Sequence, residues 1–121
     1  MSDHNHISYI EFPSTDIDKS REFFKKNFGW SFSDYGDDYT SFKEAGVHGG
    51  FFTVEESPAH PPAAVLIVLY SKDLESTLEM VKDAGCTISK ETFSYPGGRR
   101  FHFIEPGGNE LAVWSEDEDN D

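Results

Sequence analysis

The chain has 121 residues, the size of one domain or of two small modules that depend on each other. Its formal net charge of −13 disfavours nucleic acids and anionic membrane surfaces as partners, because their phosphates would repel the chain. The longest apolar run, residues 63–69, is too short to cross a bilayer, and the first residues lack the features of a signal peptide. We therefore expect a cytoplasmic protein.

The first half of the chain predicts a strand, a helix and three further strands. The strand covers residues 6–12 and the helix covers residues 17–28, with Asp16 as its N-cap and Gly29 as the left-handed residue after its last turn. Three runs bounded by Gly and Asp predict the other strands, at residues 30–35, 39–44 and 49–55.

The second half repeats this order. Residues 73–82 align with residues 16–25 at an offset of 57, and Asp73 takes the place of Asp16 as the N-cap of a second helix that ends before Gly85. The strands expected around this helix cover residues 63–70, 86–93, 99–105 and 110–114. The chain therefore reads as two βαβββ modules.

Three prolines in residues 57–62 predict a linker between a module at 6–56 and a module at 63–115. Residues 116–121 carry five acidic side chains and predict a disordered tail. Each module is close to the lower size limit at which a core supports itself, so we expect residues 1–115 to form a single α+β domain. Its two modules would build a curved mixed eight-stranded sheet with the helices outside and a concave cleft for a small molecule.

Several segments resemble one known family. They are Ile10-Glu11-Phe12-Pro13-Ser14-Thr15-Asp16, Phe28-Gly29-Trp30, Gly49-Gly50, Glu105-Pro106-Gly107-Gly108-Asn109 and the ending Glu110-Leu111-Ala112-Val113-Trp114. Together with the double βαβββ order they resemble the vicinal oxygen chelate superfamily, which includes glyoxalase I, bleomycin resistance proteins and extradiol dioxygenases, and they look closest to its glyoxalase-like proteins. Because members of the superfamily run several chemistries on one scaffold, the resemblance predicts the fold and not one activity.

The resemblance implies metal ligands at the first and fourth strands of each module in the metal-dependent members. His6 is the only clear match to such a position, because Ala63 and Ala112 stand at two of the others and have no donor atom. A metal held by protein usually needs several N, O or S donors. We therefore expect no metal cofactor; a divalent metal remains the alternative if the strand register is shifted.

Candidate site residues come from the strands. Histidine is the residue type suited to acid–base work near neutral pH, so His6 and His102 are candidate acids or bases, with a satisfied structural histidine as the alternative for each. Glu110 and Trp114 share strand parity with Ala112, so we predict that they and His6 line the ligand-binding cleft, with Glu110 as a further catalytic candidate.

Other residues have structural or open interpretations. Glu11 falls on the face opposite to His6 by strand parity, which favours a place near a helix end or an ion pair with Arg21, Arg99 or Arg100. Arg99 and Arg100 follow a flexible turn and either reach a ligand carboxylate or remain solvated. The lone Cys86 favours a packing role.

Two functions remain open from the sequence. The first is a glyoxalase-like lyase, isomerase or related enzyme that acts on a small molecule, with His6 as a metal ligand or as an acid/base. The second is a metal-free protein, similar to bleomycin resistance proteins, that sequesters a cationic or aromatic small molecule. A homodimer is expected with either function, since a small paired-module sheet leaves edge strands to cover.

Overall fold

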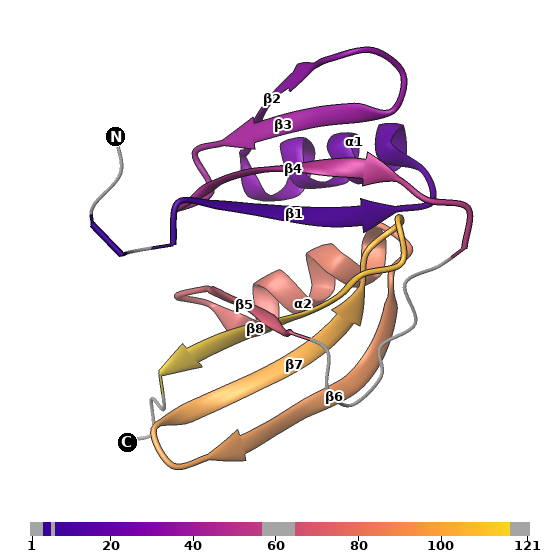
Figure 1. Ribbon diagram of the computed structural model, residues 1–121. Helices are drawn as coiled ribbons and strands as arrows, with labels where there is room; N and C mark the ends of the chain where they lie inside the picture. The colour runs from indigo at the N-terminus through magenta and orange to yellow at the C-terminus, as the bar shows by residue number, and fades with distance from the viewer. Residues whose placement is uncertain (1–3, 6, 57–64, 117–121) are drawn as a thin grey trace. The chain divides into compact units, whose positions relative to one another are not determined.

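The computed structural model describes residues 4–5, 7–56 and 65–116. The chain divides into two compact units, Met1–Ala59 with Pro106–Asn109, and His60–Glu105 with Glu110–Asp121. Each unit contains one helix and one four-stranded mixed sheet, and the helix covers one face of its own sheet (Figure 1). The α+β class and the two βαβββ modules predicted from the sequence are thus confirmed.

The first unit follows the predicted order of elements. Its sheet has the strand order β1-β4-β3-β2, in which β1 runs parallel to β4 and the other neighbours are antiparallel. The elements are β1 (Tyr9–Ser14), α1 (Ile17–Phe28), β2 (Ser31–Asp34), β3 (Tyr39–Lys43) and β4 (His48–Thr53).

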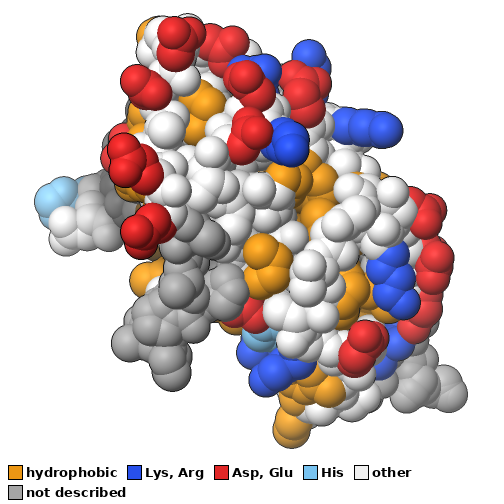
Figure 2. All heavy atoms as spheres, turned by 90° about the vertical axis from the view of Figure 1, so that its right-hand side faces the viewer, with side chains coloured by type: hydrophobic (Ala, Val, Ile, Leu, Met, Phe, Trp, Pro, Cys, Tyr) orange, Lys and Arg blue, Asp and Glu red, His pale blue; other side chains and the backbone are white. Residues whose placement is uncertain are grey.

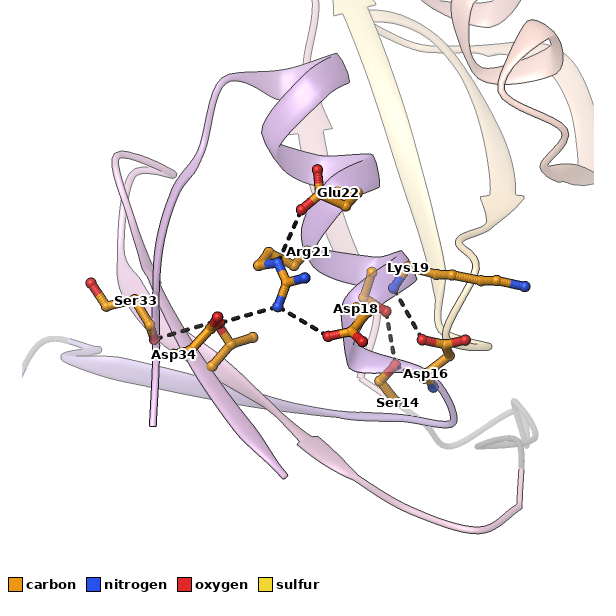
Figure 3. Close-up of polar contacts among 10 residues, drawn as sticks. Ser14, Asp16, Asp18, Lys19, Arg21, Glu22, Ser33 and Asp34 are labelled. Atoms are coloured by element: carbon orange, nitrogen blue, oxygen red, sulfur yellow. Dashed lines mark hydrogen bonds and ion pairs between the residues drawn. The ribbon is translucent and has the colours of Figure 1, made fainter. Parts of the chain in front are cut away.

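Both ends of α1 form as the sequence predicts. The Asp16 side chain accepts a hydrogen bond from the backbone N–H of Lys19 at 3.1 Å, and Gly29 takes the left-handed conformation with φ of 76°. The Arg21 guanidinium points towards Asp34 on β2 and lies 3.1 Å from its carboxylate (Figure 3). Arg21 also lies 3.1 Å from the carboxylates of its helix neighbours Asp18 and Glu22.

The core of the first unit is aromatic. Phe24 on α1 is fully buried and stacks on Trp30, with 4.4 Å between ring centroids. Phe51 on β4 is also fully buried and lies 5.6 Å from Phe24. Gly49 permits this packing, because a Cβ there would collide with the backbone of β1 and would lie 2.5 Å from the Phe42 ring.

The turn Pro106–Asn109 belongs to the first unit although it comes late in the chain. The Asn109 side-chain amide donates a hydrogen bond to the Pro13 carbonyl at 2.6 Å, and the Thr15 backbone N–H donates to the Gly107 carbonyl at 3.1 Å. A Cβ on Gly107 would collide with the Ser14 side chain. This turn therefore packs directly on the β1–α1 junction, which explains its need for glycine and asparagine.

The second unit repeats the arrangement. Its sheet has the strand order β5-β8-β7-β6, in which β5 runs parallel to β8 and the other neighbours are antiparallel. The elements are β5 (Ile67–Tyr70), α2 (Leu74–Asp83), β6 (Thr87–Tyr95), β7 (Gly98–Ile104) and β8 (Glu110–Glu116).

One face of this second sheet packs on α2. The core residues there are exposed by no more than 1% and are Leu74, Val81, Phe101, Phe103, Leu111 and Val113. Because side chains alternate along a strand, the residues between them on β7 and β8 project from the opposite face. We call that opposite face of the β5-β8-β7-β6 sheet the open face.

Some strand boundaries differ from those predicted. β1 begins at Tyr9, where its pairing with β4 begins, and β5 begins at Ile67, where its pairing with β8 begins. β8 continues to Glu116, which pairs with Gly98 on β7, so the first residue of the predicted tail is a strand residue. The predicted linker 57–62, Ala63 and tail residues 117–121 lie outside the described residues. Within the described ranges, neither helix is long and apolar enough to cross a membrane.

Candidate functional site

The open face of the second unit carries several of the side chains that the sequence singled out. On β8 it presents Glu110, Ala112 and Trp114, as strand alternation predicts. Directly opposite Ala112 and Trp114 on β7 lie His102 and Arg100. Cross-strand partners project from the same face, so these side chains form one surface.

Two irregularities on β6 add further residues to this face. Lys90 pairs with His102 and Phe93 pairs with Arg100, so three steps along β6 match two steps along β7. A second register shift lies between Ile88 and Lys90. Each β-bulge inserts one residue and reverses the alternation after it. Lys90 and Phe93 therefore both project from the open face, although an odd spacing would place them on opposite faces of a regular strand.

Glu110 and His102 form the central contact of the open face. The Nδ1 atom of His102 lies 3.1 Å from Oε2 of Glu110, and the Ser89 hydroxyl donates to the same oxygen at 2.9 Å. A carboxylate only accepts hydrogen bonds, so His102 carries its proton on Nδ1 in this pair. The Nε2 atom of the neutral ring is then a hydrogen-bond acceptor.

His102 is buried, with 7% of its surface exposed. Its Nε2 atom is inaccessible and has no hydrogen-bond partner within the described part of the chain. Leaving a buried polar atom without a partner costs about 1–3 kcal/mol. A donor that reached Nε2 after a movement of the side chains around it would remove this cost.

Arg100 lies beside the His102–Glu110 pair and is held by aromatic rings. Its guanidinium carbon is 5.5 Å from the ring centroid of Phe93 and 5.7 Å from that of Tyr95. The Phe93 ring also contacts His102, at 6.0 Å between centroids, and the ammonium of Lys90, at 5.4 Å. In the lower part of Figure 2, basic side chains and a histidine lie beside hydrophobic and acidic side chains.

Trp114 provides an apolar surface further along β8. Its ring lies 5.3 Å from that of Tyr70 on β5 in an edge-to-face arrangement. Gly98 makes room for this ring, because a Cβ there would lie 3.2 Å from the indole. The Tyr70 hydroxyl donates to Glu116 at 2.6 Å, and this hydrogen bond lowers the pKa of the Glu116 carboxyl.

The structure thus places three of the four predicted site residues on the open face: His102, Glu110 and Trp114. The fourth, His6, lies outside the described residues. The sequence analysis missed Ser89, Lys90 and Phe93, since they reach this face through bulges that strand alternation does not predict.

The ion pair predicted for Glu11 is wrong. Glu11 projects from β1 on the sheet face away from α1 and accepts a hydrogen bond from the Tyr39 hydroxyl at 2.9 Å, and the Tyr9 hydroxyl lies 2.6 Å from that of Tyr39. Burial and these two contacts raise the pKa of Tyr39. Gly50 allows the arrangement, since a Cβ there would collide with the Tyr39 ring. The missed signal was this glycine opposite Glu11.

Arg21 and Arg99 have other carboxylate partners. Arg21 is bound by the acidic residues around α1, and the Arg99 guanidinium lies 2.5 Å from Glu75 in the first turn of α2. Arg99 therefore projects from the helix-covered face, and Arg100 projects from the open face.

The described residues do not fit a metal centre of the kind implied by the resemblance. Ala112 has no donor atom, and its neighbours in register are Val68 on β5 and His102 on β7, whose Nδ1 is engaged by Glu110. Across residues 4–5, 7–56 and 65–116 no group of three or more His, Cys, Asp and Glu side chains is placed to hold a metal ion. Metal binding would need donors from elsewhere in the chain.

Cys86 is half-buried, in line with a packing role. Burial, with a smaller contribution from the Glu105 carboxylate, raises the pKa of its thiol to about 11. The thiol is therefore almost fully protonated at neutral pH, which is unfavourable for a nucleophile.

Comparisons with solved structures identify the fold. A fosfomycin resistance protein from Listeria monocytogenes, solved with Mn(II) and dihydroxypropylphosphonic acid, superposes with a TM-score of 0.77 at 16% identity, over 93% of this chain and 90% of that one. A glyoxalase-related enzyme from Fulvimarina pelagi gives 0.75 at 15% identity, over 93% and 88%. A lactoylglutathione lyase from Agrobacterium tumefaciens gives 0.69 at 15% identity, over 92% and 93%. At these identities the likeness concerns the fold alone.

No curated protein matches the sequence significantly. The family model described as Glyoxalase/Bleomycin resistance protein/Dioxygenase superfamily matches residues 6–113, which is most of the chain. The order of elements, the two mixed sheets and the Pro106–Asn109 turn agree with this match. The chain belongs to the Glyoxalase/Bleomycin resistance protein/Dioxygenase superfamily.

Proposed function

We propose that the protein binds a small molecule on the open face of the β5-β8-β7-β6 sheet, at a site that includes His102, Glu110 and Trp114. The observation that carries this proposal is the buried Nε2 atom of His102, which has no partner in the described residues. Glu110 orients the ring and leaves Nε2 as a hydrogen-bond acceptor. Because this atom is covered in the structure, the proposal requires side chains around it to move when a ligand binds. Trp114 offers an aromatic surface for stacking in the same site.

Binding in this proposal does not use the metal ligands of metal-dependent relatives. Ala112 occupies one of the ligand positions implied by the resemblance, and it is fully buried between its register neighbours His102 and Val68. A ligand would therefore be held by hydrogen bonds and aromatic contacts. This character resembles that of the sequestering proteins of the superfamily.

A second candidate function is acid–base catalysis of a lyase- or isomerase-like reaction. The observation that favours it is the Glu110–His102 hydrogen bond, because a carboxylate that orients an imidazole is a common arrangement for a general base. In this case His102 Nε2 would take a proton from the bound molecule, and Glu110 would stabilise the imidazolium that forms. Binding is common to both functions and can be tested first.

Protein-observed NMR with benzamide, indole and catechol as probes tests the binding proposal. We expect at least one of these small aromatic probes to shift the indole signal of Trp114 and the ring signals of His102. His102→Gln and Trp114→Phe should each weaken the response several-fold, whereas the matched change His48→Gln, at an exposed position on β4, should not alter it. Thermal melts would verify that each variant folds. Failure of all three probes to shift these signals at millimolar concentrations would contradict the proposal.

Elemental analysis of protein purified without a histidine tag separates the metal-free site from a metal-dependent one. The proposal predicts less than stoichiometric Zn, Ni, Mn and Fe, and unchanged probe binding after treatment with a chelator. One equivalent of any of these metals, with binding lost on its removal, would contradict the metal-free site and favour an enzyme of the metal-dependent kind.

We also propose that the protein is a homodimer. β5 is an edge strand of its sheet, and its residues Val68 and Tyr70 are 41% and 53% exposed. An exposed edge strand with large apolar side chains favours association with another chain. Sedimentation velocity at micromolar concentration should show a species of twice the monomer mass, and a monomer alone would contradict the proposal.

A further inference from the structure

We infer that the ligand of the open face carries an anionic group, a carboxylate or a phosphate, that pairs with Arg100. This inference rests on the proposed function, because it names the class of small molecule that the same site takes. It departs from the expectation of a cationic ligand, which the net charge of the chain favoured. Four observations on the second unit support it.

The first observation is how the three arginines of the chain are paired. Arg21 lies within 3.1 Å of three carboxylates, and Arg99 lies within hydrogen-bonding distance of Glu75. No carboxylate of the described residues pairs with Arg100, although the chain has 23 Asp and Glu residues against 10 Lys and Arg residues. An arginine without an acidic partner is unexpected in so acidic a chain.

The second observation is the environment of the Arg100 guanidinium. Phe93 and Tyr95 lie within cation–π distance of it, so aromatic rings hold the group in place. The side chain is half-buried, and its Nε atom is inaccessible and has no hydrogen-bond partner among the described residues. Aromatic faces offset part of the cost of burying the charge but accept no strong hydrogen bond from its N–H groups. An oxyanion would supply acceptors in a paired geometry to the terminal Nη groups, which are not among the covered atoms.

The third observation is that further positive charge lies on the same side of the sheet. The Lys90 ammonium also lies over the Phe93 ring, and one β6 bulge places it beside Arg100 on the open face. The carboxylate of Glu110 is engaged by His102 and Ser89. The charges of Lys90 and Arg100 thus lie beside Phe93, whereas the carboxylates of Glu110 and Glu116 on this face accept hydrogen bonds from other side chains.

The fourth observation is spacing. Arg100 and His102 are two residues apart on β7 and project from the same face, which places their backbones about 6.5–7 Å apart. A ligand that spans them needs an oxyanion at one end and a hydrogen-bond donor, such as a hydroxyl group, within a few bonds of it. Small hydroxy acids and small phosphate esters meet this requirement.

Matched probes and matched variants test the inference. Benzoate and benzamide have nearly the same shape and differ in charge, and phenyl phosphate carries a phosphate group on the same ring. We expect benzoate or phenyl phosphate to bind at least roughly tenfold more tightly than benzamide in NMR titrations of the whole chain. The tighter of the two anions identifies the anionic group.

Arg100→Met should remove this preference, whereas Arg99→Met should leave it within about twofold. The two variants lose the same charge from adjacent residues of β7, and Arg99 projects from the opposite face. Arg100→Lys keeps the charge without the planar fork and should restore only part of the preference.

The possible results of these titrations distinguish a failure of the inference from a failure of the proposed function. Benzamide binding as tightly as both anions would overturn the inference and leave the proposed function standing. An anion preference that Arg99→Met removes as fully as Arg100→Met would also overturn it, because the effect would then be one of general charge. If none of the probes, including indole and catechol, shifts the His102 and Trp114 signals, the proposed function fails and the inference fails with it.

Discussion

His102 and Glu110 meet diagonally across β7 and β8. His102 pairs directly with Ala112 and Glu110 pairs directly with Ile104, yet His102 Nδ1 lies 3.1 Å from the Glu110 carboxylate. A diagonal contact of this kind needs a long side chain and no bulky side chain between the two residues. The short side chain of Ala112 meets the second requirement. The same alanine stands at a position where the resemblance implies a metal ligand.

Asn109→Ala should destabilise the protein by about 1–3 kcal/mol, because it leaves the Pro13 carbonyl without the amide that donates to it at 2.6 Å. Urea unfolding followed by fluorescence would measure the change. Asn27→Ala is a matched control, since the Asn27 amide donates to Phe23, whose carbonyl lies inside α1. If Asn109→Ala costs no more than Asn27→Ala, the turn does not stabilise the first unit as described.

Gly98→Ala should also destabilise the protein, by about 1–3 kcal/mol. A Cβ at this position would collide with the Ser115 carbonyl and lie 3.2 Å from the Trp114 ring. The indole must then move, so the variant should also change the NMR signal of Trp114. Ser94→Ala, at an exposed position on β6, serves as the control. If Gly98→Ala has wild-type stability and an unmoved indole signal, the Cβ fits beside Trp114 without a shift, which would contradict the close packing described.

Cys86 should react slowly with iodoacetamide near neutral pH. Its pKa of about 11 compares with 9.0 for the ordinary thiol, so at pH 8 its thiolate is roughly a hundredfold scarcer. The labelling rate should rise steeply between pH 9 and about pH 11. The same protein in urea provides the control, because unfolding removes the burial. Equal labelling rates for the folded and unfolded protein at pH 8 would contradict this account.

The Glu75–Arg99 pair should stabilise the protein at neutral pH by at most about 1 kcal/mol, because Glu75 is largely exposed. The hydrogen bond from Arg99 lowers the pKa of Glu75 from its ordinary value of 4.5. A carboxyl with a lowered pKa in the folded state stabilises it above that ordinary value, and the contribution is lost as the pH falls through the folded-state pKa. Glu75→Gln should therefore be less stable than wild type at pH 7 and equally stable at acidic pH.

Urea unfolding of both proteins at several pH values would measure this difference. Glu79→Gln, at an exposed position of α2, controls for the loss of a negative charge. A difference between Glu75→Gln and wild type that stays constant down to acidic pH would exclude the ion pair as its cause.

The sequence predicts the fold well because its strongest signals are local. Asp16 and Asp73 cap their helices as predicted, and both accept a hydrogen bond from the backbone three residues later. Strand alternation also predicts that Glu110, Ala112 and Trp114 share a face, and the register of β8 agrees. The first residue of each strand was predicted less accurately, because the hydrogen-bonded pairing with a strand distant in sequence decides where a strand begins.

The candidate site was harder to predict because it depends on contacts between strands. No feature of residues 87–95 alone indicates two bulges, yet these bulges bring Lys90 and Phe93 to the open face. Arg99 and Arg100 are adjacent and identical in type. Only the register of β7 decides that Arg99 faces Glu75 and that Arg100 faces the aromatic rings. The partner of Glu11 was predicted wrongly because Tyr39 lies across Gly50, two strands away.

The protonation of the His102 ring tests the central claim most directly. Long-range 1H–15N correlation NMR of the imidazole nitrogens reports which of the two carries the proton. We predict that the neutral ring of His102 is protonated at Nδ1, that Glu110→Gln shifts the population towards the Nε2-protonated form, and that the tighter-binding anion probe moves the Nε2 signal of the wild type. A neutral ring protonated at Nε2 in the wild type, or an Nε2 signal that stays unmoved at saturating probe, would contradict the account.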